Sequence, residues 1–220
     1  MTDTRPHPPK DLAVDQQVAL RTAATRLAAE FRGTYGTETI ERFLYASYDQ
    51  FATATSIPNY LPLLTERFAR QRLQALARLE GHHRDGRPVA LFLCTHNSGR
   101  SPMALGFFSH LSGGDAVAWS GGNEPGATVN PAAVAAMAER GIDISDEFPK
   151  PWTDEVVRAA DVVVTMGCGD ACPVFPGTRY ENWDLDDPAG LDLPGVRPIR
   201  DEIERRVRHL LDDLRVTQQS

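Results

Sequence analysis

The chain has 220 residues, of which 41% are hydrophobic and 24% are charged, and its formal net charge is −7. This composition is typical of a globular protein with one large domain, or with a domain and an accessory unit. The acidic balance argues against nucleic-acid binding, and no apolar run in the sequence is long enough to cross a membrane. Three cysteines do not make the even set of a secreted disulfide scaffold, and the polar start of the chain does not resemble a signal peptide, so we expect a cytoplasmic protein.

Three helices are predicted in the first part of the chain. Residues 1–10 are polar and rich in proline, and we expect them to be a disordered tail. Apolar side chains then recur at helical spacing in three separate stretches, and Gly81 is typical of a helix end. This pattern predicts a three-helix bundle over residues 11–81, followed by a short polar linker over 82–87.

Strand patterns alternate with helix patterns over residues 88–216. The run Val89–Leu93 is continuously apolar, as in a strand that is buried on both faces. The other predicted elements are strands over 116–120, 161–166 and 180–185, and helices over 130–140, 153–160 and 195–215. The alternation predicts an α/β fold, in which a parallel four-stranded sheet carries helices on both faces. In such a sheet the functional site lies at the carboxyl ends of the strands.

A candidate anion-binding loop follows the first predicted strand, where Cys94 and Arg100 enclose five residues. Asn97 and Gly99 tolerate the left-handed backbone of a tight loop, and Pro102 is typical of the first turn of a helix. We therefore expect the loop amides to point inward and to surround a tetrahedral oxyanion. The expected oxyanion-binding residues are Thr95, His96, Asn97, Ser98, Gly99, Arg100 and Ser101.

Cys94 is the candidate nucleophile of this loop. A helix N-terminus and the guanidinium of Arg100 both favour the thiolate form of a neighbouring cysteine. The hydroxyl of Ser101 is expected to donate a further hydrogen bond to the sulfur. The alternative is a buried structural cysteine that ends a strand, but this alternative gives no reason for Asn97, Gly99 and Arg100 to cluster here.

Cys168 and Cys172 form a second candidate redox site. They follow the strand predicted over 161–166, so they also lie at the carboxyl edge of the sheet and can face Cys94. One interpretation is half of a metal site, and the other is a thiol pair that takes over the oxidation of Cys94. No second Cys or His pair with metal-ligand spacing occurs in the sequence, so we favour the thiol pair and expect no metal.

A candidate general acid follows the last predicted strand. Pro188 restricts the backbone of Asp187, so the carboxyl group of Asp187 is expected to have a fixed direction. A carboxylic acid above the loop can protonate an oxygen that leaves the anion. Asp186 is the second choice for this role, and a solvated acidic turn without any catalytic role is the alternative.

These motifs together resemble a known family. The loop from Cys94 to Ser101, the Cys168 and Cys172 pair, and the segment Asp186–Gly190 occur in the order found in the thioredoxin-coupled, three-cysteine arsenate reductases. Those enzymes are built on the low-molecular-weight tyrosine phosphatase fold. The resemblance covers about residues 88–215, and the helical bundle before it resembles an extension found on some actinobacterial members.

The resemblance implies a reaction as well as a fold. Cys94 would attack arsenate, while Arg100 and the loop amides hold its oxygens and Asp187 protonates the departing hydroxide. Cys168 would then attack the sulfur of Cys94, releasing arsenite, and Cys172 would move the disulfide to the Cys168–Cys172 segment. Thioredoxin is the implied reductant, and no cofactor is implied.

Two other functions and two structural questions remain open at this stage. A low-molecular-weight protein tyrosine phosphatase would use Cys94, Arg100 and Asp187 in the same way, although such enzymes usually place aromatic residues where Ala189 follows Pro188. A non-enzymatic redox or arsenical sensor is the second alternative. Some family members bind potassium through an acidic residue where this chain has Leu105, so the resemblance does not extend to this ion, and the sequence leaves open whether any ion binds near the loop. The bundle could form a homodimer or simply cover the domain.

Overall fold

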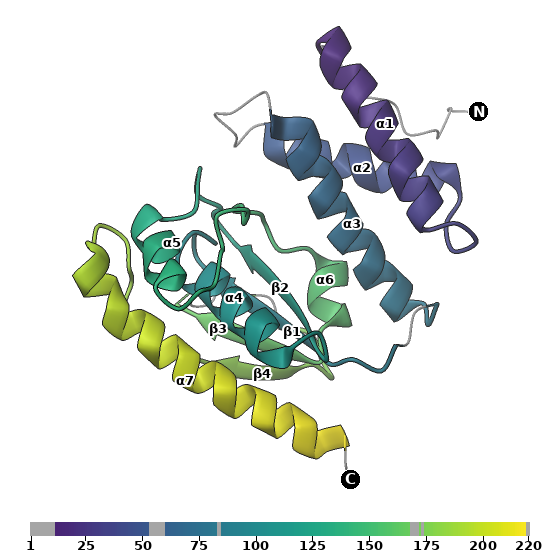
Figure 1. The fold of residues 1–220 in the computed structure, drawn as a ribbon. Helices are drawn as coiled ribbons and strands as arrows, with labels where there is room; N and C mark the ends of the chain where they lie inside the picture. Colours follow the sequence, from purple (N-terminus) through teal and green to yellow (C-terminus); the bar gives the residue numbers. More distant parts are fainter. Residues whose placement is uncertain (1–11, 53–59, 83–84, 168–171, 173, 219–220) are drawn as a thin grey trace. The chain divides into compact units, whose positions relative to one another are not determined.

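The computed structural model describes residues 12–52, 60–82, 85–167, 172 and 174–218 (Figure 1). The chain divides into two compact units, one within residues 1–83 and the other within residues 84–220. The predicted disordered tail and part of the predicted linker, residues 83 and 84, lie outside the described residues. Within the described part of the chain, no helix has the length and apolar character needed to cross a membrane.

The first unit is a bundle of three helices, which confirms the prediction for this part of the chain. The helices are α1 (Val14–Glu30), α2 (Thr37–Ala52) and α3 (Leu61–Leu79). Their apolar stripes meet in a core that includes Leu27, Ile40 and Phe68, all of them fully buried. Phe51 packs edge-to-face on Phe68, with ring centroids 5.3 Å apart.

The second unit holds a four-stranded parallel sheet with the strand order β2-β1-β3-β4. The strands are β1 (Val89–Cys94), β2 (Val117–Gly122), β3 (Val162–Met166) and β4 (Arg179–Asn182). The helices of this unit are α4 (Arg100–Ser112), α5 (Pro131–Ala138), α6 (Asp154–Ala159) and α7 (Leu193–Gln218). The predicted α/β fold is therefore confirmed.

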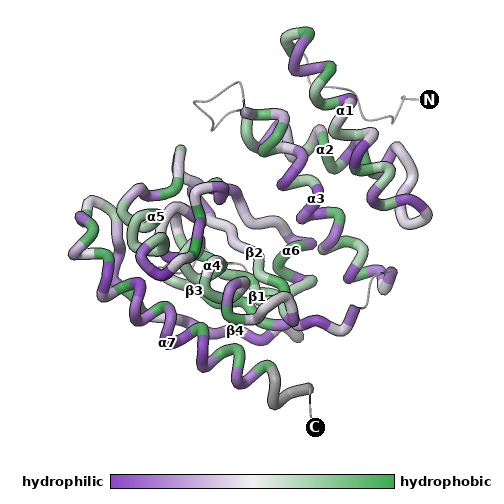
Figure 2. The backbone as a smooth tube through the Cα atoms, viewed as in Figure 1, coloured by the Kyte–Doolittle hydropathy of each residue, from purple (hydrophilic) through white to green (hydrophobic). Residues whose placement is uncertain are grey.

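Helices cover both faces of the sheet, as predicted. Phe92 of β1 and Val164 of β3 belong to one core with residues of α4, α5 and α7. Leu91 and Leu93 alternate with Phe92 and are buried on the opposite face, where α6 packs against β1. The two central strands are apolar, whereas the edge strand β4 is hydrophilic (Figure 2). A charged edge of this kind discourages pairing with another chain.

Among the elements whose limits differ from the prediction, the last strand and the last helix matter most for the acidic segment between them. The last strand ends at Asn182 rather than at residue 185, so the acidic segment after it is free of the sheet. Helix α7 begins at Leu193, two residues before the predicted start, because the side chain of Asp192 accepts a hydrogen bond from the backbone N–H of Gly195 and caps the first turn.

Candidate active site

The site is built where β1 passes into α4. Cys94 is the last residue of β1, and Arg100 is the first residue of α4. The Cys94 side chain is buried and carries a free thiol. It lies in a cavity of about 80 Å³, which the loop shares with Asn130 and with the segment from Asp187 to Ala189.

Three carbonyl groups of the loop point outward, because each accepts a hydrogen bond from a backbone N–H of the segment over residues 124–130. The acceptor–donor pairs are Thr95 O with Glu124 N at 2.9 Å, His96 O with Gly126 N at 2.8 Å, and Ser98 O with Asn130 N at 2.7 Å. In a trans peptide the N–H points away from the C=O, and the described residues contain no cis bond. The N–H groups of the same three peptides therefore point toward the inside of the loop, where a tetrahedral anion can accept hydrogen bonds from them.

A directed chain of hydrogen bonds ends on the sulfur of Cys94. The backbone N–H of Lys150 donates to Oδ1 of Asn97 at 3.0 Å, and this contact fixes the orientation of the amide. Nδ2 of Asn97 then donates to the Ser101 hydroxyl at 2.8 Å. The Ser101 oxygen lies 3.0 Å from the Cys94 sulfur, and toward a thiolate the Ser101 hydroxyl can only be the donor. This arrangement stabilises a thiolate.

Arg100 and Asp187 meet above the loop. Nη2 of Arg100 donates to Oδ2 of Asp187 at 2.7 Å, and Nη1 reaches the carbonyl of Leu185 at 3.4 Å. The Arg100 side chain is buried, whereas the Asp187 side chain is 49% exposed. Oδ1 of Asp187 also accepts a hydrogen bond from the backbone N–H of Ala189. The guanidinium is thus held beside the cavity in a position from which it can fork two anion oxygens.

The two aspartates of the acidic segment, Asp186 and Asp187, line different cavities. Asp187 lines the cavity that contains Cys94. Asp186 lines a separate pocket, together with residues of α7 such as Ile199 and Glu202. The structure therefore places the first-choice candidate acid, and not the second, at the cavity of the candidate nucleophile Cys94.

The segment that leads to the second thiol pair touches the loop. The hydroxyl of Thr95 donates to the carbonyl of Gly167 at 3.0 Å. Gly167 directly follows β3 and has a φ of 76°, a conformation that suits glycine. A Cβ there would lie 2.6 Å from Nη1 of Arg100, so the backbone of Gly167 lies against the guanidinium. Cys168 falls outside the described residues, and Cys172 is disulfide-bonded.

The remaining predicted residues have supporting positions. His96 contacts the carbonyl of Glu124 through Nδ1 at 3.0 Å, so the ring faces the neighbouring segment. Gly99 lies under the ring of Pro188, because a Cβ at Gly99 would come within 2.5 Å of the Pro188 Cγ. Within the residues that the structure describes, no cluster of three or more His, Cys, Asp or Glu side chains could hold a metal ion.

Three residues that support the site were not predicted from the sequence. A Cβ at Gly122 would lie 2.6 Å from the carbonyl oxygen of Thr95, so β2 must end in glycine for the loop to pass. The backbone N–H of Lys150 donates to the side chain of Asn97. Asn130 donates from its backbone to the loop and from its side chain to the carbonyl of Pro188. The asparagine before Pro131 was a recognisable helix cap, but the partners of these residues are distant in the sequence.

A thiol at the floor of an amide-lined loop, with an arginine and an aspartate at its mouth, defines a phosphatase-type anion site on a parallel sheet. Residues 89–220 match the family of low molecular weight phosphotyrosine protein phosphatases, and residues 20–77 match the N-terminal domain of protein-tyrosine-phosphatase-like proteins. The chain belongs to the low molecular weight phosphotyrosine protein phosphatase family.

The similar proteins within this family include several arsenate reductases. Arsenate reductase 1 of Staphylococcus haemolyticus is 39% identical over 127 residues, which are 56% of this chain and 94% of that protein. The solved structure of a thioredoxin-dependent arsenate reductase of Corynebacterium glutamicum is 39% identical with a TM-score of 0.81, and the match covers 92% of this chain and 99% of that chain. A structure described as an arsenate reductase in the phosphate binding state is 36% identical with a TM-score of 0.52, over 57% of this chain and 98% of that one.

Proposed function

We propose that the protein reduces arsenate to arsenite and that Cys94 is the nucleophile. The observation that carries this proposal is the position of the Cys94 thiol, at the floor of a cavity that is ringed by loop amides and flanked by Arg100 and Asp187. Arsenate has the tetrahedral shape and the charge for which such a loop supplies donors. The match to the Corynebacterium glutamicum enzyme, which extends over 92% of this chain, supports the same conclusion.

The first step transfers arsenic to sulfur. The Cys94 thiolate attacks the arsenic atom, an S–As bond forms, and one As–O bond breaks. Asp187 delivers a proton to the departing oxygen, which leaves as water. Arg100 and the loop amides hold the remaining oxygens and stabilise their charge.

The second step reduces the arsenic. The Cys168 thiolate attacks the sulfur of Cys94, and the electron pair of the S–As bond passes to arsenic, so that As(V) becomes As(III) and arsenite departs. Cys172 then attacks Cys168, which frees Cys94 and leaves a Cys168–Cys172 disulfide. Two observations support this sequence: Gly167, which precedes Cys168, lies against the loop, and Cys172 is disulfide-bonded while Cys94 is free.

Thioredoxin is the proposed reductant of the Cys168–Cys172 disulfide, and the reducing cytoplasm is the proposed compartment. No bound cofactor is required, because the three thiols carry both electrons. We assign the reaction to residues 88–216, with residues 82–87 as a linker. The bundle over residues 11–81 is proposed to mediate homodimer formation, which a scattering mass at micromolar protein concentration would test.

A phosphotyrosine phosphatase is the second candidate, because the family carries that name and the first step is the same. A coupled assay separates the two functions by following NADPH consumption in the presence of arsenate, thioredoxin and thioredoxin reductase. We expect sustained turnover by the wild type, no turnover by Cys94→Ser, and loss of turnover in Cys168→Ser and Cys172→Ser. Phosphate-ester hydrolysis that survives in Cys168→Ser, with no arsenate reduction by the wild type, would instead identify a phosphatase.

A further inference from the structure

Asn130 makes three contacts that join the anion-binding loop, helix α5 and the segment that carries Asp187. Its backbone N–H donates to the carbonyl of Ser98 at 2.7 Å. Its side-chain Oδ1 accepts a hydrogen bond from the backbone N–H of Ala132 at 2.8 Å and caps α5. Its Nδ2 donates to the carbonyl of Pro188 at 3.0 Å. With Oδ1 fixed by the cap, the amide can only present its donor side to Pro188.

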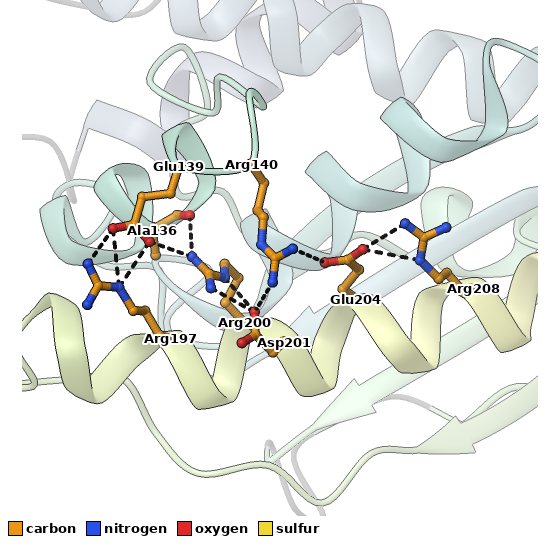
Figure 3. Close-up of polar contacts among 8 residues, drawn as sticks. All are labelled: Ala136, Glu139, Arg140, Arg197, Arg200, Asp201, Glu204 and Arg208. Carbon is orange, nitrogen blue, oxygen red and sulfur yellow. Dashed lines mark hydrogen bonds and ion pairs between the residues drawn. The ribbon is translucent and has the colours of Figure 1, made fainter.

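The support behind Asn130 is rigid. Helix α5 is fixed to α7 by a network of arginines and carboxylates (Figure 3). Arg200, which is 5% exposed, donates to the carbonyl of Ala136 at 2.9 Å and to Glu139 at 2.7 Å. Arg197 donates to Glu139 as well. A residue that caps α5 is therefore attached to the frame of the domain rather than to a loose helix.

The Asp187 carboxylate has few other restraints. It accepts hydrogen bonds from Arg100 and from the backbone N–H of Ala189 in its own turn. Arg100 is also the side chain that must bind the anion. When the guanidinium turns its donors to anion oxygens, the contact between Arg100 and Asp187 weakens or is lost. The turn then depends on the Pro188 ring, which packs on Gly99, and on two hydrogen bonds to the Pro188 carbonyl, one from the backbone N–H of Leu191 at 3.2 Å and one from Asn130.

We propose that Asn130 is a positioning residue that keeps the Asp187 carboxyl group over the anion cavity once Arg100 has engaged the anion. This inference rests on the proposed function, in which Asp187 is the acid of the first step. Asn130 acts through Asp187 in this view, because its Nδ2 donates to the Pro188 carbonyl. Asn130 also lines the anion cavity, so the phosphate affinity of its variants decides whether it acts through Asp187 or on the anion. Its loss should lower the rate of the first chemical step and leave anion affinity nearly unchanged.

The test compares Asn130→Ser with Asn130→Ala. Serine is a good helix cap and alanine is a poor one, but neither reaches the carbonyl of Pro188. We expect both variants to lower the single-turnover rate constant of arsenite formation by about tenfold, since one hydrogen bond is lost. Only the alanine variant should also lower the melting temperature. The dissociation constant of inorganic phosphate, measured by calorimetry, should stay within about twofold of the wild-type value in both. If only Asn130→Ala lowers the rate, in parallel with its lower melting temperature, then Asn130 has a merely structural role and the proposal is overturned.

The second arm is a double-mutant cycle with Asp187→Asn. If Asn130 acts through Asp187, Asn130→Ser should lower the rate by no more than about twofold in the Asp187→Asn background. A tenfold effect in that background would overturn the proposal. If Asp187→Asn lowers the single-turnover rate constant and Asn130→Ser does not, this inference is overturned and the proposed function stays intact. A fast Asp187→Asn enzyme would remove the acid assigned in the proposed function, and this inference with it.

Discussion

Arg100 and Asp187 form an ion pair at the cavity that contains the thiol of Cys94, with Nη2 of the arginine 2.7 Å from Oδ2 of the aspartate. The same guanidinium is the group best placed to bind the anion. In the proposed mechanism the pair would link anion binding to proton transfer, because an anion that attracts Arg100 would release Asp187, the proposed acid.

This relationship predicts different effects on binding and on chemistry. Asp187→Asn should lower the single-turnover rate of arsenite formation by about 100-fold, as expected for loss of a general acid. The affinity for inorganic phosphate should be equal to or higher than that of the wild type, because Arg100 loses a competing partner. Asp186→Asn is the matched control, since Asp186 lines a different pocket, and its rate should remain at the wild-type level. Weaker phosphate binding in Asp187→Asn would contradict this view of the ion pair.

Ser101 should control the reactivity of Cys94. Its hydroxyl is 3.0 Å from the sulfur and accepts a hydrogen bond from the amide of Asn97. Ser101→Ala should lower the rate of Cys94 alkylation by iodoacetamide at pH 7 by about tenfold, because a hydrogen bond to a charged group is removed. Ser112→Ala on the same helix removes a hydroxyl that donates to the Ser109 carbonyl, and it should leave the rate unchanged. Equal alkylation rates in the two variants would show that the hydrogen bond has no role.

Gly167 should be required for the position of Arg100. Gly167→Ala places a methyl group in the space of the Arg100 guanidinium and also strains a residue with a φ of 76°. Gly141 has a similar φ of 72° but open space around it, so Gly141→Ala isolates the strain. Both variants should lose about 1 kcal/mol of unfolding free energy. Only Gly167→Ala should also weaken phosphate binding, by about tenfold, and equal phosphate affinity in both would contradict the close contact.

Glu139 should make the stability of the second unit depend on pH in acid. Hydrogen bonds from Arg197 and Arg200 lower the pKa of Glu139 from 4.5 to about 2. The folded state therefore holds this proton less tightly than the unfolded state, and the stabilisation is complete above about pH 4.5. It is lost as the pH falls toward 2. In urea unfolding, the difference in midpoint between wild type and Glu139→Gln should be constant above pH 5. It should shrink as the pH falls from about 4.5 to about 2.

The control for that experiment is Asp212→Asn, at an exposed position on α7. Its midpoint difference from the wild type should show no such decline between pH 4.5 and pH 2. A Glu139→Gln difference that is independent of pH would mean that the arginine contacts do not discriminate between the two protonation states of Glu139.

The sheet and the loop were predictable from the sequence because their signals are local. The apolar run Val89–Leu93 is typical of a strand buried on both faces and forms most of β1, and Asn97 does adopt the left-handed conformation expected of it, with a φ of 47°. The placement of the site at the carboxyl ends of the strands follows from a general rule for α/β sheets, whereas the strand order β2-β1-β3-β4 was not predicted.

The hydrogen bonds that orient the site were not predictable in the same way. Asn97 is oriented by Lys150, which is 53 residues away, and Asn130 binds Pro188 across 58 residues. Such pairs appear only once the chain has folded, since no periodicity or motif connects their positions. The choice between Asp186 and Asp187 depended on Pro188 alone in the sequence, whereas in the structure the two side chains lie in separate cavities.

The most direct measurement of the central claim is the disulfide that remains after a single turnover. The reduced protein is mixed with one equivalent of arsenate, quenched with an alkylating reagent, digested and analysed by mass spectrometry. The account predicts a disulfide between Cys168 and Cys172 in the wild type, and one between Cys94 and Cys168 in Cys172→Ser, each with one equivalent of arsenite released. If arsenite forms while all three cysteines are recovered alkylated, or if no arsenite forms at all, then the oxidation of Cys94 is not transferred to this pair and the account is contradicted.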